Sequence, residues 1–397
     1  MPAFDEQRAI VVGGSIGGLT AALLLRDLGF RVDVFERTPT VLDGRGAGIV
    51  LQPDTVRWLT ERRTDVSVEA VSTGSSKLRY IGAGNAIVHE EPAQWRFTSW
   101  TTLYRFLLQD FGRENYHLGE VAAGLDQDVD GVDLRFVSGR TERADLVVFA
   151  DGISSTGRRR LLPHVRPRYS GYVGWRGTVP EDEVSAETAG LLDDALTYAV
   201  ADHSHICMYP IPGVGGELDK GARLLNYVWY RNVPEGPVLS EMLTDTRGFE
   251  ATVSVHPGGV QDRYVAELKE RAVSDLPPAA AEMVVRTAQP YIQPVLDIAV
   301  PQMAFGRVAL LGDAAFAARP HAAAGTAKAA ADAWALADAL SEEDDIAKAL
   351  AAWEPDRLAL GEDLLSRVCE MGARSQFTGT WDPTDPALHF GLYGPDR

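Results

Sequence analysis

The fold is decided by the stretch RAIVVGGSIGGLTAALLLRDLGFRVDVFER, residues 8–37. Its first five residues are mostly apolar and predict a strand, and the following GGSIGG at 13–18 predicts a tight turn. An uncharged run then predicts a helix through Leu25, and RVDVFER at 31–37 predicts a second strand that carries Glu36 near its end. A strand, a glycine turn, a helix and a second strand in this order indicate a βαβ unit.

This unit predicts a dinucleotide site. The N-terminus of the helix offers unpaired backbone N–H groups and a positive dipole, which suit a pyrophosphate. Gly13 supplies the tight turn and Gly18 allows close packing of helix and strand, while Glu36 can accept hydrogen bonds from ribose hydroxyls. The middle position of the fingerprint is Ser15 instead of glycine, and its hydroxyl can itself donate. These residues alone do not say which dinucleotide is bound.

Further along the chain, the pattern changes twice. Short runs rich in aromatic and β-branched residues predict an antiparallel sheet in a separate region, at 172–179, 196–201, 205–210 and 222–231. Beyond Pro290 the pattern returns to the parallel type, with a strand at 308–312. An alanine-rich helix is expected over 327–340, and another helix to about Gly372. The last residues, from Gly379, are expected to form an irregular surface segment.

Composition excludes several classes of protein. The 397 residues include 38 Lys and Arg against 56 Asp and Glu, for a net charge of −18, so we expect no nucleic-acid partner and no anionic membrane surface. The two cysteines, Cys207 and Cys369, lie far apart and form no metal-binding pattern, so no metal is expected. The uncharged run from Ile10 to Leu25 is too short for a membrane span, and a cytoplasmic protein is expected.

Two later motifs point to a flavin. VVFADGISSTGRRRLL at 147–162 is a strand that ends in Asp151-Gly152 and leads to Arg158. The second motif, in the segment 306–340, delivers Gly312-Asp313 at the end of a buried strand, and small residues then lead to a helix. Asp313 can hold a ribityl or ribose hydroxyl, and the open N–H groups at the helix start favour an anion such as the reduced flavin edge.

The three motifs in this order resemble those of the group A flavoprotein aromatic monooxygenases. The resemblance covers nearly the whole chain and includes GYVGWRG (171–177), MYPIPG (208–213) and RPHAAAG (319–325). It implies an α/β fold with a Rossmann-like FAD domain of the glutathione-reductase type, an antiparallel-sheet substrate domain and C-terminal helices. The implied FAD domain comprises 1–72, 98–168 and 291–340. The substrate domain comprises 73–97 and 169–290, and the C-terminal helix and tail comprise 341–397.

The resemblance also implies the cofactors and the residues that hold them. One active site would use FAD, with NADH or NADPH and O2 as co-substrates. In the family, the Asp-Gly motif serves both FAD and NAD(P)H, and a loop here reading GRGAGI (44–49) lies beside the flavin. The implied cofactor-binding residues are Gly13, Ser15, Gly18, Glu36, Arg37, Arg45, Gly48, Asp151, Gly152, Arg158, Gly312, Asp313, Pro320, Ala323, Ala324 and Gly325. Trp100 stands where the family often has an arginine, and Arg105 lies one turn further on.

The implied reaction is hydroxylation of an electron-rich aromatic or N-heteroaromatic ring through a flavin C4a-hydroperoxide. The protein must exclude water and raise the nucleophilicity of the ring at its hydroxyl group. His205 is the first candidate catalytic residue and substrate contact, because a neutral imidazole can accept a proton near neutrality. Tyr209, Tyr227 and Trp229 are candidates for a wall of the substrate site, and His321 lies in the loop expected to face the flavin. Aromatic residues at strand spacing also fit a plain core.

Other functions compete with this one. The related FAD halogenases carry a Trp-x-Trp-x-Ile-Pro motif, and the chain has none. A monooxygenase that acts on a phenolic substrate, and a flavin- or nucleotide-binding sensor without catalysis, both remain as alternatives. The resemblance further implies a small aromatic substrate and a homodimer.

Overall fold

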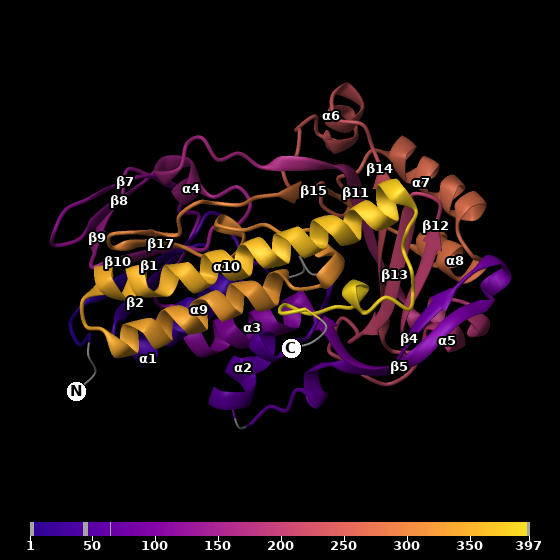
Figure 1. Cartoon of the computed structure of the whole chain (residues 1–397), viewed down its shortest axis with the longest axis horizontal. Coiled ribbons are helices and arrows are strands. Elements are labelled where there is room, and N and C mark those ends of the chain that lie inside the picture. The colour runs from indigo at the N-terminus through magenta and orange to yellow at the C-terminus, as the bar shows by residue number, and fades with distance from the viewer. Residues whose placement is uncertain (1–3, 43–46, 64, 395–397) are drawn as a thin grey trace.

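The computed structural model describes residues 4–42, 47–63 and 65–394, and its strands form two large sheets (Figure 1). The first, sheet A, has six strands and contains the predicted βαβ unit, with β1 and β2 parallel neighbours joined by α1. Four of its five strand pairs are parallel, as expected of a Rossmann-like domain. Its strands, in spatial order, are β16 (Ala304–Phe305), β17 (Val308–Leu310), β10 (Leu146–Phe149), β1 (Arg8–Val12), β2 (Arg31–Glu36) and β6 (Tyr116–Leu118).

Sheet B has eight strands and is almost entirely antiparallel. Four of its strands fall on the aromatic runs of the sequence, and the others come from segments that carry no such signal. In spatial order they are β15 (Tyr291–Asp297), β11 (Arg168–Pro180), β14 (Leu224–Asn232), β13 (Ser204–Ile211), β12 (Ala195–Ala201), β4 (Thr73–Ile81), β5 (Ile87–Ser99) and β3 (Gly48–Val50). The two sheets confirm the expected fold class. A small third sheet contains β7 (Ala122–Gln127), β8 (Val132–Phe136) and β9 (Thr141–Ala144).

Helices cover both large sheets. On the sheet A side, α1 packs against α3 and α9, and the long α10 runs beside α9 across the molecule (Figure 1). On the other side, α7 and α8 cover one face of sheet B. The helices are α1 (Ile16–Asp27), α2 (Pro53–Arg62), α3 (Trp100–Phe111), α4 (Thr156–Leu161), α5 (Ala186–Leu192), α6 (Pro237–Leu243), α7 (Asp262–Asp275), α8 (Pro278–Arg286), α9 (Gly325–Glu342) and α10 (Ile346–Ala373).

Two of the expected FAD segments contain strands that belong to sheet B. The expected FAD segment 291–340 begins with β15, but β15 pairs with β11 and belongs to sheet B. Likewise β3, inside the expected FAD segment 1–72, pairs with β5 of sheet B. Strand pairing joins segments that are distant in the sequence and carry no local mark of their partner, so the sequence does not show to which sheet such a strand belongs.

The two faces of sheet B differ in what covers them. On β14, residues 225, 227 and 229 face α7 and α8 in a hydrophobic core, and residues 226, 228 and 230 face the opposite way. This second, inner face looks toward the C-terminal tail, which returns from the end of α10 past β13 and β12 (Figure 1). The tail was expected to be a surface segment, yet Leu388 and Phe390 are buried. The inner face is therefore enclosed by the chain's own terminus.

Candidate active site

A cleft of about 1100 Å³ separates the two sheets. It begins at the carboxyl ends of β1 and β2, where ligands bind in open α/β sheets, and it ends at the β11–β15 edge of sheet B. The expected cofactor residues that line it are Gly13, Ser15, Glu36, Arg37, Asp151, Gly152, Gly312, Asp313 and Gly325. One cleft thus brings together all three sequence motifs.

The fingerprint turn leaves no room for side chains. Gly13 has a φ of +105°, and a Cβ on it would lie 2.4 Å from the carbonyl oxygen of Ala150. A Cβ on Gly18 would lie 1.9 Å from the carbonyl oxygen of Gly13, well inside van der Waals contact. These two glycines therefore bring the start of α1 close against β1 and β10, which is the packing that the fingerprint predicts.

The polar groups around this turn are arranged for an ADP moiety. Ser15 is the residue before α1, and its hydroxyl does not cap the helix, so the N–H groups of the first turn remain free to donate to a ligand. Glu36 is buried and accepts hydrogen bonds from the N–H groups of Gly14 and Thr38, both at 2.9 Å. Glu36 Oε1 also accepts from the hydroxyl of Thr38, at 2.8 Å, whereas Oε2 accepts only from Gly14 and can take a second hydrogen bond from a ribose hydroxyl. Arg37 is exposed at the mouth of the cleft.

The Gly-Asp motif brings a second anion-binding device to the cleft. The α9 helix begins at Gly325 without a side-chain cap, and Gly325 and Thr326 both line the cleft. Asp313 makes no hydrogen bond through its carboxyl group within the described chain, and burial raises its pKa to about 6. An acceptor without a partner at this place fits a ribityl hydroxyl.

Sequence reasoning missed the charges that hold this motif in place. Lys328 and Asp332, both fully buried in α9, form an ion pair of 2.5 Å, and Asp332 also accepts the N–H of Gly312 at 3.0 Å. The pair fixes the turn at Gly312 against the helix. A lysine and an aspartate four residues apart in an alanine-rich helix are the signal that could have revealed it.

Arg158 occupies a different place from the one expected. It is 1 % exposed and does not line the cleft; its guanidinium donates to the carbonyl oxygens of Ala314, at 2.9 Å, and Ile153. The arginine therefore ties the Asp-Gly loop to the Gly-Asp loop from beneath and holds Asp313 in position. Asp151 lies between cleft and helix, where its Oδ2 caps α4 at Thr156 and its Oδ1 has no partner in the described chain.

The loop expected to face the flavin is anchored to the protein around it. Ala323 adopts a left-handed φ of +51°, and its carbonyl oxygen accepts from Gln52 at 2.8 Å. Pro320, Ala323 and Ala324 do not line the cleft, and only Gly325 of the predicted loop residues does. Gly48 packs on the inner face of sheet B, with its N–H donating to Asn226. Arg45 lies outside the described residues.

The predicted histidines come together on the inner face of sheet B. We call the group formed by Tyr172, Tyr198, His205, Tyr230, His321 and Trp381 the aromatic cluster. The rings of His205 and His321 lie 5.2 Å apart, and each lies 4.7 Å from the ring of Tyr230. The hydroxyl of Tyr172 is 2.7 Å from His321 Nε2, while His321 Nδ1 is buried and has no partner in the described chain.

Two members of this region come from the chain end, and sequence reasoning missed them. Trp381 stacks on His205 with ring centroids 5.0 Å apart, and Gln376 Nε2 lies 3.4 Å from His205 Nδ1. The tail is held there by hydrogen bonds from Leu392 N to Gln52 and from Gly391 N to the carbonyl of Ala322. The only signal in the sequence was the aromatic content of the tail.

Burial keeps both histidines neutral. Desolvation lowers the pKa of His205 to about 3 and holds the pKa of His321 well below its usual range. With the amide of Gln376 donating to Nδ1, the neutral ring of His205 carries its proton on Nε2. This environment disfavours a charged imidazolium, because a buried one would lack water and a counter-ion, and the role of His205 as a general base stays a prediction.

The other predicted substrate residues are not in the cluster. Tyr227 and Trp229 are buried on the opposite face of sheet B, in the core against α7 and α8. Tyr209 shares the inner face, but its hydroxyl donates to the carbonyl of Gly48 at 2.9 Å and its ring stacks on Phe97. The prediction of a substrate wall was wrong for Tyr227 and Trp229, because side chains alternate between faces and the sequence did not show which face is covered by helices.

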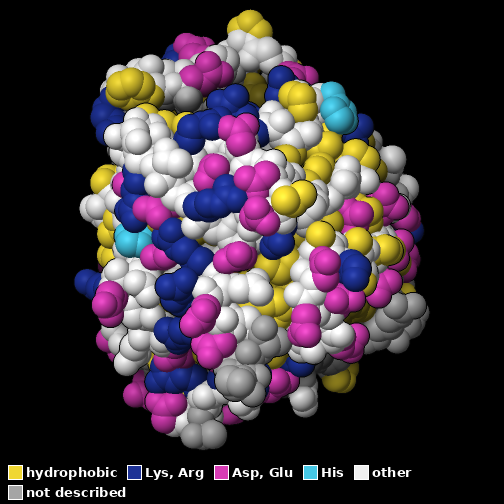
Figure 2. Space-filling model, turned by 90° about the vertical axis from the view of Figure 1, so that its left-hand side faces the viewer, with side chains coloured by type: hydrophobic (Ala, Val, Ile, Leu, Met, Phe, Trp, Pro, Cys, Tyr) yellow, Lys and Arg dark blue, Asp and Glu magenta, His cyan; other side chains and the backbone are white. Residues whose placement is uncertain are grey.

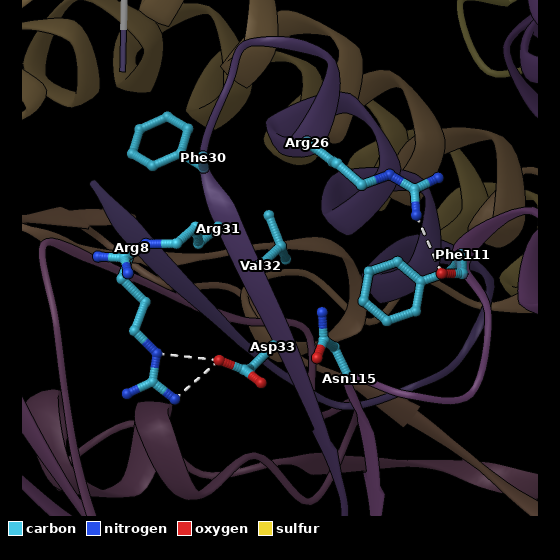
Figure 3. A pocket seen from close by; sticks show the side chains of 8 residues that line it. All are labelled: Arg8, Arg26, Phe30, Arg31, Val32, Asp33, Phe111 and Asn115. Carbon is cyan, nitrogen blue, oxygen red and sulfur yellow. Dashed lines mark hydrogen bonds and ion pairs between the residues drawn. The ribbon is translucent and has the colours of Figure 1, made fainter. Parts of the chain in front are cut away.

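A second hollow, of about 490 Å³, lies at the edge of sheet A (Figure 3). Three arginines line it, but each already has acceptors. Arg8 is paired with Asp33 and Glu142, Arg26 donates to the carbonyls of Asp110 and Phe111, and Arg31 to that of Glu6. At the adjoining end of the molecule, side chains of Lys and Arg are interspersed with those of Asp and Glu (Figure 2). Each of the three arginines that line this hollow therefore already has a hydrogen-bond acceptor.

None of the helices in the described chain has the length and apolar character needed to cross a membrane. Within the same residues, no three or more His, Cys, Asp or Glu side chains are placed to hold a metal ion.

The cleft fits FAD on the grounds of its own structure, since it joins two uncapped helix starts, a ribose acceptor and the unpartnered Asp313. Comparisons with known proteins agree. Residues 11–54 match the family of NAD(P)-binding Rossmann-like domains, and residues 169–297 match the FAD binding domain-like family. The chain belongs to the FAD-dependent aromatic monooxygenases, and it uses FAD with NAD(P)H and O2 as co-substrates.

Particular relatives make the family relation specific. The chain is 42 % identical to 2,6-dihydroxypyridine 3-monooxygenase of Paenarthrobacter nicotinovorans, over 97 % of this chain and 96 % of the relative. The structure of 2,6-dihydroxypyridine-3-hydroxylase from Arthrobacter nicotinovorans superposes with a TM-score of 0.93 at 40 % identity, covering 98 % of both chains. A more distant relative, 6-hydroxynicotinate 3-monooxygenase of Pseudomonas fluorescens, is 28 % identical over 85 % of this chain and 83 % of its own.

Proposed function

We propose that this enzyme hydroxylates a hydroxylated N-heteroaromatic ring, with conversion of 2,6-dihydroxypyridine to 2,3,6-trihydroxypyridine as the reaction. The observation that carries the proposal is the aromatic cluster. It encloses two buried polar atoms that have no partner in the described chain, His321 Nδ1 and Gln376 Oε1, among ring faces that suit a flat substrate. The relatives named above act on hydroxylated pyridine rings, which supports the same substrate class here.

In this proposal, bound FAD would supply the activation of O2 with NAD(P)H as reductant, and the chain supplies binding, orientation and the exclusion of water. Residues 13–18, Glu36 and Arg37 hold the ADP half, and Asp313 with the start of α9 holds the ribityl and pyrophosphate groups. His205 Nε2 donates to a hydroxyl oxygen on the substrate ring and positions the ring. Tyr172 and His321 hold one edge of the ring, and Trp381 closes the side toward the tail, which keeps water away.

The same reasoning supports the coarser organisation. We propose a cytoplasmic homodimer, in which the FAD domain is formed mainly by sheet A with α9 and the substrate domain mainly by sheet B. The net charge of −18 suits a protein that stays dissolved and repels nucleic acid and anionic membranes. The family resemblance supports the dimer.

Turnover with the proposed substrate tests this function. We expect the purified protein to be yellow, and 2,6-dihydroxypyridine to accelerate NADH or NADPH consumption with formation of the trihydroxylated product. 2,6-Dimethoxypyridine, which has no ionisable hydroxyl, is the matched control and should neither accelerate consumption nor be hydroxylated. Acceleration by phenols alone would assign the enzyme a phenolic substrate. A yellow protein whose reduction no aromatic ring accelerates would contradict the proposal and indicate a silent flavin sensor.

A further inference from the structure

Arg176 is a cation on the inner face of sheet B for which the described chain provides no counter-ion. It lies in the middle of β11, and within the described chain it pairs with no carboxylate; its hydrogen-bond partner there is the neutral hydroxyl of Tyr291. Its Nε is buried without a partner, although the side chain as a whole keeps partial exposure. A desolvated guanidinium without a counter-ion is costly, so a place for an anion beside it would offset that cost.

Arg176 differs from three other arginines that pair with carboxylates, and also from Arg158, whose guanidinium donates to backbone carbonyls. Arg223 is paired with Glu181 and Asp193, and Arg319 with Asp297 at 2.8 Å. Arg231, on the neighbouring strand β14 but on the helix-covered face, lies 3.5 Å from Glu267. Each of these three arginines is therefore neutralised by a carboxylate, whereas Arg176 has no carboxylate partner within the described chain.

The position of Arg176 links the cleft to the aromatic cluster. Across one strand boundary its partner is Tyr291, and Thr178 follows it on the same face; both line the cleft. Across the other boundary lies Val228, two residues from Tyr230, whose ring contacts both His205 and His321. A ring bound between cleft and cluster thus lies next to this guanidinium.

The groups that face Arg176 are neutral. They are the hydroxyls of Tyr209, Tyr230 and Tyr291 and the thiol of Cys207, and burial raises the pKa of each of them, to about 12 for Cys207. His205 and His321 are also neutral, and Arg319 is already paired with Asp297. The uncompensated positive charge near the cluster is therefore that of Arg176.

We propose that Arg176 binds an anionic oxygen on the ring of the substrate, so that the enzyme selects rings bearing an ionised hydroxyl. The inference rests on the proposed function, because it concerns the substrate of the same site. An ionised hydroxyl makes an aromatic ring more electron-rich and more reactive toward an electrophilic oxygen. A fixed guanidinium would therefore both recognise the ring and hold it in its reactive form. The pyrimidine edge of the flavin offers the same oxyanion chemistry, and the experiment separates the two sources.

The test compares Arg176→Gln with wild type and with Arg231→Gln, a matched control on the opposite face of the same sheet. Binding is measured from the change in the flavin spectrum for a panel of hydroxypyridines and phenols, each paired with its O-methyl ether. We expect Arg176→Gln to weaken binding of the hydroxylated member about 10-fold or more and to leave the ether within about 2-fold. Arg176→Lys keeps the charge and should recover part of the loss. FAD content shows that each variant is folded.

Three results would overturn the inference. One is an equal loss for the hydroxylated ring and its ether, and another is no loss for either. The third is an altered flavin reduction potential with unchanged ring binding, which would assign Arg176 to the flavin edge. Failure of the proposed function is a separate result, because it is the absence of hydroxylated product from 2,6-dihydroxypyridine, whichever ring of the panel binds.

Discussion

The cofactor cleft and the aromatic cluster are built in different ways. The cleft is formed largely by backbone: glycines at 13 and 18, two helix starts and a few acceptors, each within a short motif. The cluster is formed by side chains from β11, β12, β13, β14, the 320–324 loop and the C-terminal tail. A backbone site depends on local conformation, whereas a side-chain site depends on which faces and which distant segments meet.

The sharpest way to break the cleft is a side chain on a glycine of the fingerprint turn. Gly18→Val places a Cβ 1.9 Å from the carbonyl oxygen of Gly13, and a backbone atom cannot move aside. We expect loss of bound FAD, and with it all NAD(P)H oxidation, measured as the ratio of flavin absorbance to protein. Gly190→Ala is the control, because nothing lies within 4 Å of a Cβ at that exposed helical position. A Gly18→Val protein that retains its full complement of FAD would contradict the close packing at this turn.

The next comparison sets the two faces of sheet B against each other. His205→Ala removes a donor to the substrate oxygen, and we expect hydroxylated product per NAD(P)H to fall about 10- to 100-fold, as for loss of a hydrogen bond to a charged group. FAD content should not change. Tyr227→Phe, on the helix-covered face, should leave the product yield unaltered.

The pH dependence sharpens this result. Because burial lowers the pKa of His205 to about 3, the ring stays neutral across the working range. We expect no step near pH 6.5, the ordinary value for histidine, in the ratio of wild-type to His205→Ala rates. A step there would contradict the burial of a neutral His205. A Tyr227→Phe enzyme as impaired as His205→Ala would contradict the assignment of faces.

The smallest effect is expected in the tail. Trp381→Ala removes the ring that stacks on His205 and its hydrogen bond to the hydroxyl of Tyr80. An aromatic contact contributes about 0.5–1.5 kcal/mol, so KM for the ring substrate should rise about 2- to 10-fold while FAD content stays constant. Phe249→Ala, at a side chain that is 69 % exposed, is the control. An unchanged KM would mean that the tail does not form part of the substrate site.

The sequence alone determined the βαβ unit, the order of the three motifs, the family resemblance, and the residues Glu36, Asp151 and Asp313 at the cleft. These features depend on the conformational preferences of neighbouring residues, because glycines favour tight turns and the hydrophobic pattern of a short segment indicates a strand or a helix. The four aromatic strands could also be predicted from the sequence, since β-branched and aromatic residues favour pleated surfaces. The ends of these strands agree with the structure to within a few residues.

Only the tertiary structure decided the rest. It placed Tyr227 and Trp229 in a core, assigned β15 and β3 to sheet B and put Arg158 beneath the cleft. It also folded the tail over His205 and left Arg176 without a counter-ion. Each of these features depends on contacts between segments far apart in the chain. The sequence of a strand does not show which of its two faces other elements cover. The charge environment of a buried group follows from those contacts, so its pKa and its chemistry follow from the fold as well.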